Sequence, residues 1–343
     1  MGSTLRTREQ EVQDASAQRP HLVILGAGAS VAACPQGDRN GKKLPVMADL
    51  VWTIGLADLL SKAGVPFEGR NFEDIYSSIC AIPACRELTI TIDNRVADYF
   101  RQLELPDSPT IYDYLVLCLR DKDVIATFNW DPFLWLACVR NHRRAKPPTL
   151  LFLHGCAVVG FCQAHKPIKV GPMGTICPAC GRSYTPTRLL FPVANKSYTG
   201  DPYISVQWHI LRTVLKDAFL LTIFGYGAPI TDAAAVELMS EAWGGPHQRA
   251  MEEIEIIDIL DEEQLVKRWE RFIHSHHYVT ATDFFECLIA RHPRRSCEAM
   301  WQQNMEAEYI EDNPVARCAT LDGLWKWFEP LWLAEGQELP AKQ

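Results

Sequence analysis

Two groups of residues in this sequence could bind or transform a small molecule. The first is a glycine-rich run, Gly26-Ala27-Gly28-Ala29-Ser30, which directly follows an apolar segment. A turn without Cβ atoms between a buried strand and a helix lets a phosphate approach backbone N–H groups, and the helix N-terminus adds partial positive charge. Ser30 could cap that helix or donate to a phosphate. The third glycine of the usual dinucleotide-binding spacing is missing, so a tight turn without a ligand is the alternative for this run alone.

The second group consists of polar residues that follow two further apolar segments. Asn129 and Asp131 come just after Thr127, and His154 follows a run that ends at Leu153. An amide both donates and accepts, a carboxylate favours a developing cation, and an imidazole can act as a base near neutral pH. Each residue alone would be interpreted as a helix cap or a structural histidine. Because these residues and the glycine run end separate predicted strands of one sheet, we expect them to meet at one ligand site.

Two pairs of metal-binding residue types lie further along the chain. Cys162-x-x-His165 and Cys177-x-x-Cys180 each place two ligands on one tight turn. This spacing favours a tetrahedral zinc ion. Four protein ligands leave no open coordination position, so we expect a structural site that stabilises a segment poor in apolar residues. Free thiols in a loop are the alternative, and nearby Cys156 could replace His165 as the fourth ligand.

Short apolar runs that alternate with longer helical stretches must position these residues. This alternation predicts an α/β fold, a Rossmann-like parallel sheet with helices on both faces, a small zinc-binding insertion and helical additions. Near-continuous apolar runs are typical of strands that are covered on both faces. The predicted strands are residues 21–25, 124–127, 150–153, 219–223 and 254–257.

The same patterns predict the domain organisation. Residues 1–20 are polar and are expected to form a flexible tail. The main domain is expected over 21–260, with a helical insertion at about 42–122 and the zinc knuckle at about 156–186. Residues 261–343 show helical periodicity and are expected to form a helical C-terminal region.

Composition excludes some classes of function. A net charge of -8 over 343 residues argues against direct binding of nucleic acid, which needs a broad surplus of Lys and Arg. No apolar run approaches the length that spans a bilayer, so no membrane association is expected. The 12 cysteines are scattered, and the first 20 residues lack the apolar centre of a secretory signal. A reducing cytoplasm is therefore expected, where paired cysteines more often bind metal.

The order of these motifs resembles that of the sirtuin superfamily. The glycine run, Asn129-x-Asp131, His154-Gly155 and the paired cysteines follow one another as they do in that family. With Gly225-Tyr226-Gly227-Ala228-Pro229 the resemblance spans about residues 21–260. It implies a catalytic domain that takes NAD as its substrate and carries a structural zinc ion.

The resemblance also implies roles for individual residues. In that family the glycine turn holds the NAD pyrophosphate, and the asparagine and histidine act at the nicotinamide ribose. Carried over, Asn129 positions a water or the ribose, Asp131 helps to bind the nicotinamide end, and His154 is the base. The positions implied to contact NAD are Gly26, Ala27, Gly28, Ser30, Thr127, Gly225 and Tyr226.

Departures from the family pattern indicate a subclass. Residues 32–44 contain nothing comparable to the Gly-Ile-Pro-Asp-Phe-Arg-like stretch of protein deacylases, and Gly225-Tyr226-Gly227 replaces their Gly-Thr-Ser-like loop. The chain is more similar to the divergent prokaryotic branch that hydrolyses NAD, several members of which act in antiviral defence. Asn71-Phe72-Glu73-Asp74 and the tract from Pro192 to Lys196 also resemble that branch.

The resemblance therefore implies an NAD hydrolase that releases nicotinamide and ADP-ribose in abortive infection. Such an activity must be restrained, which implies a homo-oligomer or a regulatory defence partner protein. The alternatives are an NAD-dependent protein deacylase and a non-catalytic module that senses NAD or ADP-ribose.

Overall fold

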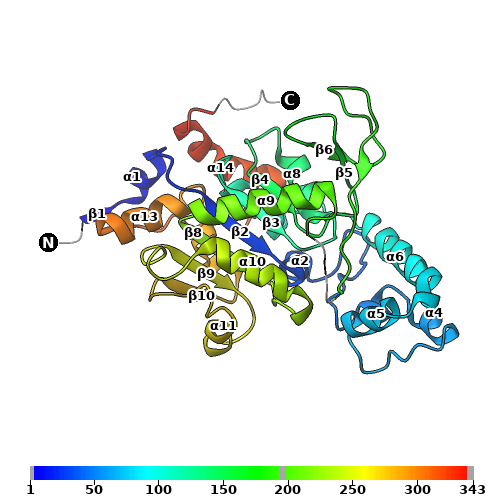
Figure 1. Ribbon diagram of the computed structural model, residues 1–343. Helices are drawn as coiled ribbons and strands as arrows, with labels where there is room; N and C mark the ends of the chain where they lie inside the picture. The colour runs from blue at the N-terminus through cyan, green and yellow to red at the C-terminus, as the bar shows by residue number, and fades with distance from the viewer. Residues whose placement is uncertain (1–3, 194–195, 197, 338–343) are drawn as a thin grey trace.

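The centre of the structure is a six-stranded parallel sheet. The computed structural model describes residues 4–193, 196 and 198–337. Its main sheet has the strand order β10-β9-β8-β2-β3-β4, and all neighbouring strands run parallel (Figure 1). The strands are β2 (His21–Leu25), β3 (Val124–Thr127), β4 (Thr149–Phe152), β8 (Leu220–Phe224), β9 (Glu253–Ile257) and β10 (Tyr278–Ala281).

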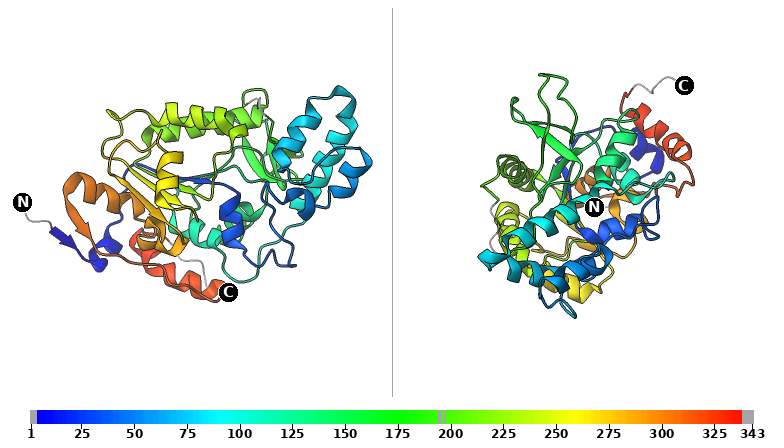
Figure 2. Two further views of the ribbon diagram at one scale, coloured as in Figure 1. Left: turned by 90° about the horizontal axis from the view of Figure 1, so that it is seen from below. Right: turned by 90° about the vertical axis from the view of Figure 1, so that its right-hand side faces the viewer.

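The predicted α/β architecture is confirmed. The five apolar runs coincide with β2, β3, β4, β8 and β9 to within one residue at each end. Every residue of β2 and β8 is buried, because helices cover both faces of the sheet. Helices α9 (Pro202–Asp217) and α10 (Ala233–Trp243) lie on one face, and α7 (Ile111–Cys118) and α14 (Leu321–Ala334) lie on the other (Figure 2).

A helical lobe lies beside the sheet, on the right of Figure 1. Its helices pack through apolar positions at helical spacing, such as Ile75 and Ile79 on one helix and Ile92 and Val96 on another. The side chain of Asn71 caps one of these helices by accepting from the N–H of Asp74 at 2.9 Å. The elements are α3 (Leu50–Thr53), α4 (Ala57–Lys62), α5 (Phe72–Cys80), η1 (Pro83–Cys85) and α6 (Arg86–Arg101).

The N-terminal segment, for which the sequence predicted a flexible tail, contains a strand and a helix within residues 4–13. Strand β1 (Thr4–Arg6) pairs with β11 (Glu308–Ile310), and helix α1 (Arg8–Gln13) follows it. The buried carboxylate of Glu11 lies 2.8 Å from Nδ1 of His292. The polar residues that suggested a tail thus find partners some 300 positions away, which no local pattern reveals. Residues 1–3 of the expected tail lie outside the described residues.

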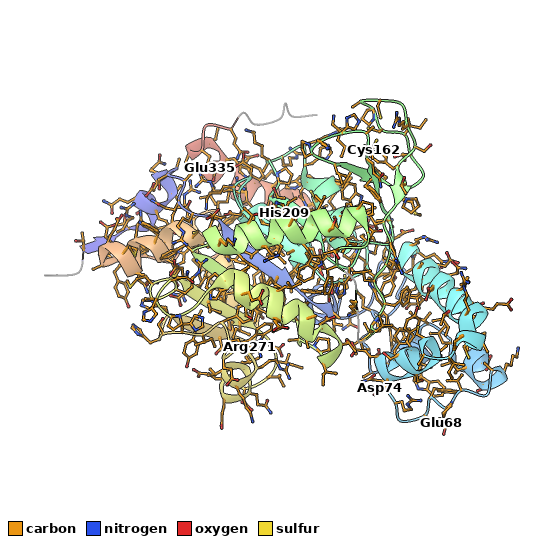
Figure 3. All side chains as sticks on the ribbon, viewed as in Figure 1. Glu68, Asp74, Cys162, His209, Arg271 and Glu335 are labelled. Atoms are coloured by element: carbon orange, nitrogen blue, oxygen red, sulfur yellow. The ribbon has the colours of Figure 1, made fainter. Side chains whose placement is uncertain are left out.

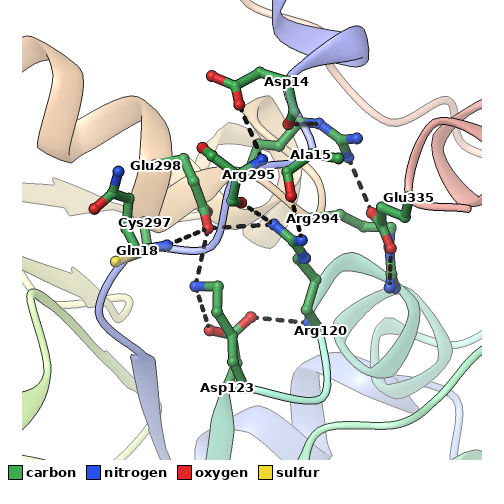
Figure 4. Close-up of polar contacts among 12 residues, drawn as sticks. Asp14, Ala15, Gln18, Arg120, Asp123, Arg294, Arg295, Cys297, Glu298 and Glu335 are labelled. Atoms are coloured by element: carbon green, nitrogen blue, oxygen red, sulfur yellow. Dashed lines mark hydrogen bonds and ion pairs between the residues drawn. The ribbon is translucent and has the colours of Figure 1, made fainter.

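Buried ion pairs hold these terminal elements near the amino ends of the strands. Arg294 donates from Nε and Nη2 to the two carboxylate oxygens of Glu335, at 2.7 and 2.6 Å (Figure 4). Arg120 contacts Glu298 at 3.3 Å and donates to the carbonyl of Ala15 at 2.9 Å. Removing one partner of such a buried pair leaves an uncompensated charge, so the chain ends are integral to the fold.

The sequence predicted a helical C-terminal region, but the structure also contains two strands there. Between α11 (Glu262–Arg268) and α12 (Leu288–Arg291) the chain adds β10 to the edge of the sheet, and β11 follows α13 (Ser296–Glu306). A four-residue edge strand that is only half-buried carries too weak an apolar signal to be recognised. Within the described ranges, no helix is both long and apolar enough to cross a membrane.

Candidate active site

A cavity of about 440 Å³ lies at the carboxyl ends of the central strands. Strands β8, β2, β3 and β4 end in register, with Leu25 opposite Phe224 and Thr127, and Thr127 opposite Phe152. The chain connections change direction between β2 and β8, which is where ligands bind in open α/β sheets. The volume falls in the range of small-molecule sites, about 300–1,000 Å³.

The structure brings nearly all of the predicted catalytic and cofactor-contacting residues together at this cavity. Thr127 is the exception, because it is buried behind the cavity and its Oγ1 accepts from the N–H of Asn129 at 3.0 Å. The residues that follow separate strands, which were expected to meet at one edge of the sheet, thus line one cavity. The predicted residues that line the cavity are Gly26, Ala27, Gly28, Ser30, Asn129, Asp131, His154, Gly225 and Tyr226.

The glycines of the first turn pack against a second glycine loop. The N–H of Gly26 donates to Phe224 O, and the N–H of Gly28 donates to Gly225 O, both at 3.0 Å. A Cβ on Gly28 would lie 2.8 Å from the Cα of Gly225. The sequence suggested that these glycines leave room for a phosphate. The structure shows a different requirement, since two backbone loops touch here and the N–H of Gly28 is already used.

Gly225→Ala is expected to lower the free energy of unfolding by more than the usual cost of a left-handed alanine. Gly225 has a φ of +58°, and its Cβ would lie 2.3 Å from the backbone N of Ala29. Gly41→Ala is the matched control, since Gly41 has a φ of +75° and no atom within 4 Å of the added Cβ. Urea unfolding should show a loss of about 1–2 kcal/mol for the control and several kcal/mol for Gly225→Ala. Equal losses would contradict the loop contact.

Asn129 and Asp131 form a buried hydrogen-bond network beneath the glycine turn. Nδ2 of Asn129 donates to Gly26 O at 2.8 Å, to Ser30 Oγ at 3.0 Å and to Tyr112 OH at 3.3 Å. The hydroxyl of Ser30 donates to Asp131 Oδ2 at 2.7 Å. Burial raises the pKa of Asp131, and the hydrogen bond from Ser30 opposes that rise. The network fixes the turn after β2 to the loop after β3.

His154 occupies an aromatic and poorly solvated position after β4. Its ring meets Phe128 edge-on with centroids 4.8 Å apart and stacks at 6.1 Å with Tyr198. Burial lowers the pKa of His154 to about 3, so the imidazole is neutral at pH 7. Within the described part of the chain its Nε2 has no hydrogen-bond partner. A neutral imidazole is the form in which a histidine can accept a proton.

Three charged residues of the cavity were not predicted as site residues. Asp232 follows β8 in η2 (Ile230–Asp232), and its carboxylate contacts the ammonium group of Lys196 and accepts from Tyr226 OH at 3.0 Å. Glu73 enters from α5, and burial raises its pKa. Asp232 lies three residues beyond the recognised Gly225-to-Pro229 run. Its position shortly after a predicted strand could therefore have identified it as a site residue. Nothing local places Glu73 of a distant helical lobe in this cavity.

The helical lobe covers the outer side of the cavity. Residues 44–48 and Leu50 line it, together with Phe100 of α6. Phe128 and Tyr226 also line the cavity, and their rings stack with centroids 4.1 Å apart and planes inclined by 4°. Apolar walls of this kind strengthen the electrostatic interactions of the charged groups that lie beside them. The lobe therefore supplies apolar side chains that line the cavity as well as the carboxyl group of Glu73.

A second site lies on a small antiparallel sheet of β6 (Lys169–Pro172), β5 (Val159–Cys162) and β7 (Thr185–Pro186). The ligand atoms of Cys162, His165, Cys177 and Cys180 all lie within 4.8 Å of one another, and Figure 3 labels Cys162 on this sheet. The Cys162 and Cys180 sulfurs are 3.6 Å apart, and Cys177 Sγ is 3.5 Å from His165 Nε2. Donors around a tetrahedral zinc ion lie about 3.3–3.8 Å apart, so these two distances and the donor types fit this metal.

Cys156 does not belong to this group. Its Sγ donates to the carbonyl oxygen of Asp131 at 3.5 Å, and its backbone N–H donates to Thr187 Oγ1 at 3.0 Å. Of the two candidates for the fourth ligand that the spacing left open, the structure brings His165 into the group. Cys156 instead connects the small sheet to the loop that carries Asp131.

The small sheet also packs against the turn that carries His154. The carbonyl of His154 accepts from the N–H of Leu190 at 3.0 Å. Gly155 has a φ of +80°, and a Cβ there would lie 2.2 Å from the carbonyl oxygen of Arg188. The chain that leaves the small sheet therefore holds the histidine turn in place.

Comparisons with known proteins find structural likeness only. No protein-family model and no curated protein matches the chain. It is similar to a solved Sir2 homologue in complex with NAD, at 11% identity and a TM-score of 0.35, over 90% of this chain and 96% of that chain. A Sir2 enzyme structure that addresses mechanism and regulation has 13% identity and a TM-score of 0.37, over 77% and 90%. A Sir2 complex with an inhibitor, 2'-O-acetyl-ADP-ribose and a deacetylated p53 peptide has 12% identity and a TM-score of 0.36, over 77% and 87%.

Proposed function

We propose that the protein binds NAD in this cavity and hydrolyses the bond between nicotinamide and ribose, releasing nicotinamide and ADP-ribose. One observation carries the proposal. The glycine turn, Asn129 and His154, which the sirtuin resemblance assigns to NAD, line a single cavity although they follow three different strands. An apolar pocket with a few convergent polar groups is typical of a small-molecule site.

The residues present suit the charge changes of this reaction. When the C–N bond breaks, its electron pair leaves with neutral nicotinamide, and positive charge develops on the ribose. The carboxylate of Asp131 favours that charge, and one preorganised group of this kind is worth about 3 kcal/mol of transition-state stabilisation. Water then forms the new C–O bond, and its proton passes to the neutral imidazole of His154.

The structure suggests a more specific role for Asn129 than the resemblance alone. Its amide N–H groups hold Gly26 and Ser30, while its Oδ1 accepts no hydrogen bond from any described residue. We infer that this oxygen accepts from the attacking water or from a ribose hydroxyl. Asn129 would then couple the shape of the glycine turn to the position of the reacting group.

Asn129→Ala is expected to lower kcat/KM for NAD hydrolysis by about a hundredfold. It should also lower the free energy of unfolding by about 1–3 kcal/mol, because Gly26 O and Ser30 lose a buried donor. Steady-state kinetics and urea unfolding measure the two effects. Asn304→Ala is the control, since Asn304 bonds to Met251 O outside the cavity and should retain full activity. Full activity of Asn129→Ala would contradict the assignment.

We further propose that Cys162, His165, Cys177 and Cys180 bind one zinc ion. Four ligands fill its coordination, so the ion stabilises the small sheet and takes no part in the reaction. Its separation from the cavity residues agrees with this role, because none of the four lines the cavity.

The biological setting that we propose is depletion of cytoplasmic NAD in prokaryotic antiviral defence. An unrestrained hydrolase would harm its own cell. We therefore infer that an oligomeric assembly or a defence partner controls access to the cavity.

Incubation of the purified protein with NAD alone tests the proposed reaction. Release of equal amounts of nicotinamide and ADP-ribose, without any acylated peptide, is the expected result. Turnover that requires an acylated peptide would identify a deacylase, and binding of NAD without turnover would indicate a sensing module. Either outcome, obtained with the protein in its active assembly, would overturn the proposed hydrolase.

A further inference from the structure

Asp232 is the polar centre of the cavity wall next to His154. Its side chain is 6% exposed, and it meets three groups from different segments. Oδ2 accepts from Tyr226 OH at 3.0 Å, and Oδ1 contacts Nζ of Lys196 and lies 3.9 Å from Nε2 of His154. The unpartnered ring nitrogen of the histidine thus faces a carboxylate that is already paired with a cation.

We propose that Asp232 is the positioning residue for His154, and that Lys196 restrains it. Asp232 holds the imidazole proton on Nε2, which leaves the lone pair on Nδ1 for the reaction. This inference rests on the proposed function for its catalytic consequence, but the geometry that carries it does not depend on the identity of the substrate.

The first argument is the lack of any other partner. Among the described residues, Nε2 of His154 makes no hydrogen bond, and a buried polar atom without one costs about 1–3 kcal/mol. The carboxylate of Asp232 lies 3.9 Å from this nitrogen. A movement of about 1 Å would bring it to hydrogen-bond distance, which is about 2.7–3.2 Å. Catalytic hydrogen bonds are often long in the free enzyme and shorten when substrate binds.

The second argument is the charge around the imidazole. The neighbours of its ring are aromatic, namely Phe128 and Tyr198. Asp232 and Lys196 are the charged groups that act on its pKa, the carboxylate raising it and the ammonium lowering it, against a larger lowering by burial. Glu73 faces this ion pair from α5, and its own pKa responds to both members.

The two members of the ion pair should therefore have opposite effects on His154. If the pair were only structural, Asp232→Asn and Lys196→Met would break the same contact with the same result. If Asp232 positions the histidine, loss of Asp232 removes the group that favours the imidazolium ion. Loss of Lys196 instead exposes the imidazole to an uncompensated carboxylate, which favours that ion.

The ¹⁵N chemical shifts of the histidine ring test the positioning role without any turnover. The signal of His154 is identified by its absence in His154→Ala. In the wild-type protein at pH 7 we expect the neutral ring with its proton on Nε2, and in Asp232→Asn we expect that preference to be lost. A proton on Nδ1 in the wild type, or no change in Asp232→Asn, would overturn the proposal even if the protein hydrolyses NAD.

The pH dependence of kcat gives the second measurement. Asp232→Asn is expected to lower kcat by about tenfold to a hundredfold with little change in KM, and to move the acid limb to lower pH. Lys196→Met is expected to move the acid limb to higher pH, because the base then takes up its proton more readily. Asp121→Asn, in an exposed ion pair with Lys146, should change neither. Shifts in the same direction for both cavity variants would overturn the proposal.

Discussion

Replacing His154 by alanine is expected to lower kcat for NAD hydrolysis by about a hundredfold to ten-thousandfold. The variant would lose the proposed acceptor of the proton from the attacking water, but it would retain the glycine turn and the carboxylate of Asp131. KM should therefore change much less than kcat. Release of nicotinamide from NAD at saturating concentration measures the effect.

His209→Ala is the matched control for this variant. His209 lies exposed on the outer side of α9, where Figure 3 labels it, and does not line the cavity. We expect this protein to hydrolyse NAD like the wild type. A His154→Ala protein that keeps its circular dichroism spectrum and its full activity would show that another residue is the base.

The same variant should change the response of the fold to acid. The pKa of His154 is lowered from 6.5 to about 3 by burial, so between these values the unfolded chain binds a proton that the native protein does not. Native stability contributed by the neutral imidazole is thus present above pH 6.5 and is lost as the pH falls towards 3. His154→Ala removes this loss, and its free energy of unfolding should fall less steeply below pH 6.5.

Cys177→Ser is expected to abolish zinc binding and to unfold the small sheet of β5, β6 and β7. The wild-type protein should carry about one zinc ion per chain, and the variant close to none. Cys177 is fully buried among the ligand group, and few apolar residues surround it to replace the metal. Zinc contributes on the order of 10 kcal/mol to the folding of small metal-dependent modules. Elemental analysis and hydrogen exchange measure the two effects.

Two cysteine controls make this test specific. Cys80→Ser alters an exposed thiol on α5 and should keep the zinc and the fold. Cys156→Ser should also keep the zinc, because Cys156 lies outside the ligand group. A wild-type protein without metal, or a Cys156→Ser protein that loses it, would contradict the ligand assignment.

Loss of zinc is also expected to disturb the position of His154 in the cavity, because the small sheet contacts the histidine turn through its backbone. The chain leaving the small sheet donates from Leu190 to the carbonyl of His154 and passes within contact distance of Gly155. Because these contacts orient the histidine turn, the small sheet supports the geometry of the cavity without contributing a ligand to it. The insertion that carries the four candidate zinc ligands therefore contacts the histidine turn directly.

Several parts of the fold were determined by local sequence alone. The runs that form β2, β3 and β8 are almost entirely apolar, so burial on both faces could be predicted from composition. The polar residues at their carboxyl ends could be expected to converge, because parallel strands in register present their ends at one edge. The spacing of the cysteine and histidine pairs likewise reflects a constraint within single turns.

Tertiary structure alone decided which residues surround the histidine. Asp232 and Lys196 meet across 36 positions of the chain, and Glu73 reaches them from a helical lobe inserted between two strands. The glycine turn is required by contact with Gly225, which is about 200 residues away. Local patterns report backbone conformation and burial, whereas the partner of a buried charge depends on how distant segments pack. For that reason the sequence indicated where the site lies, and only the fold revealed the charges that control it.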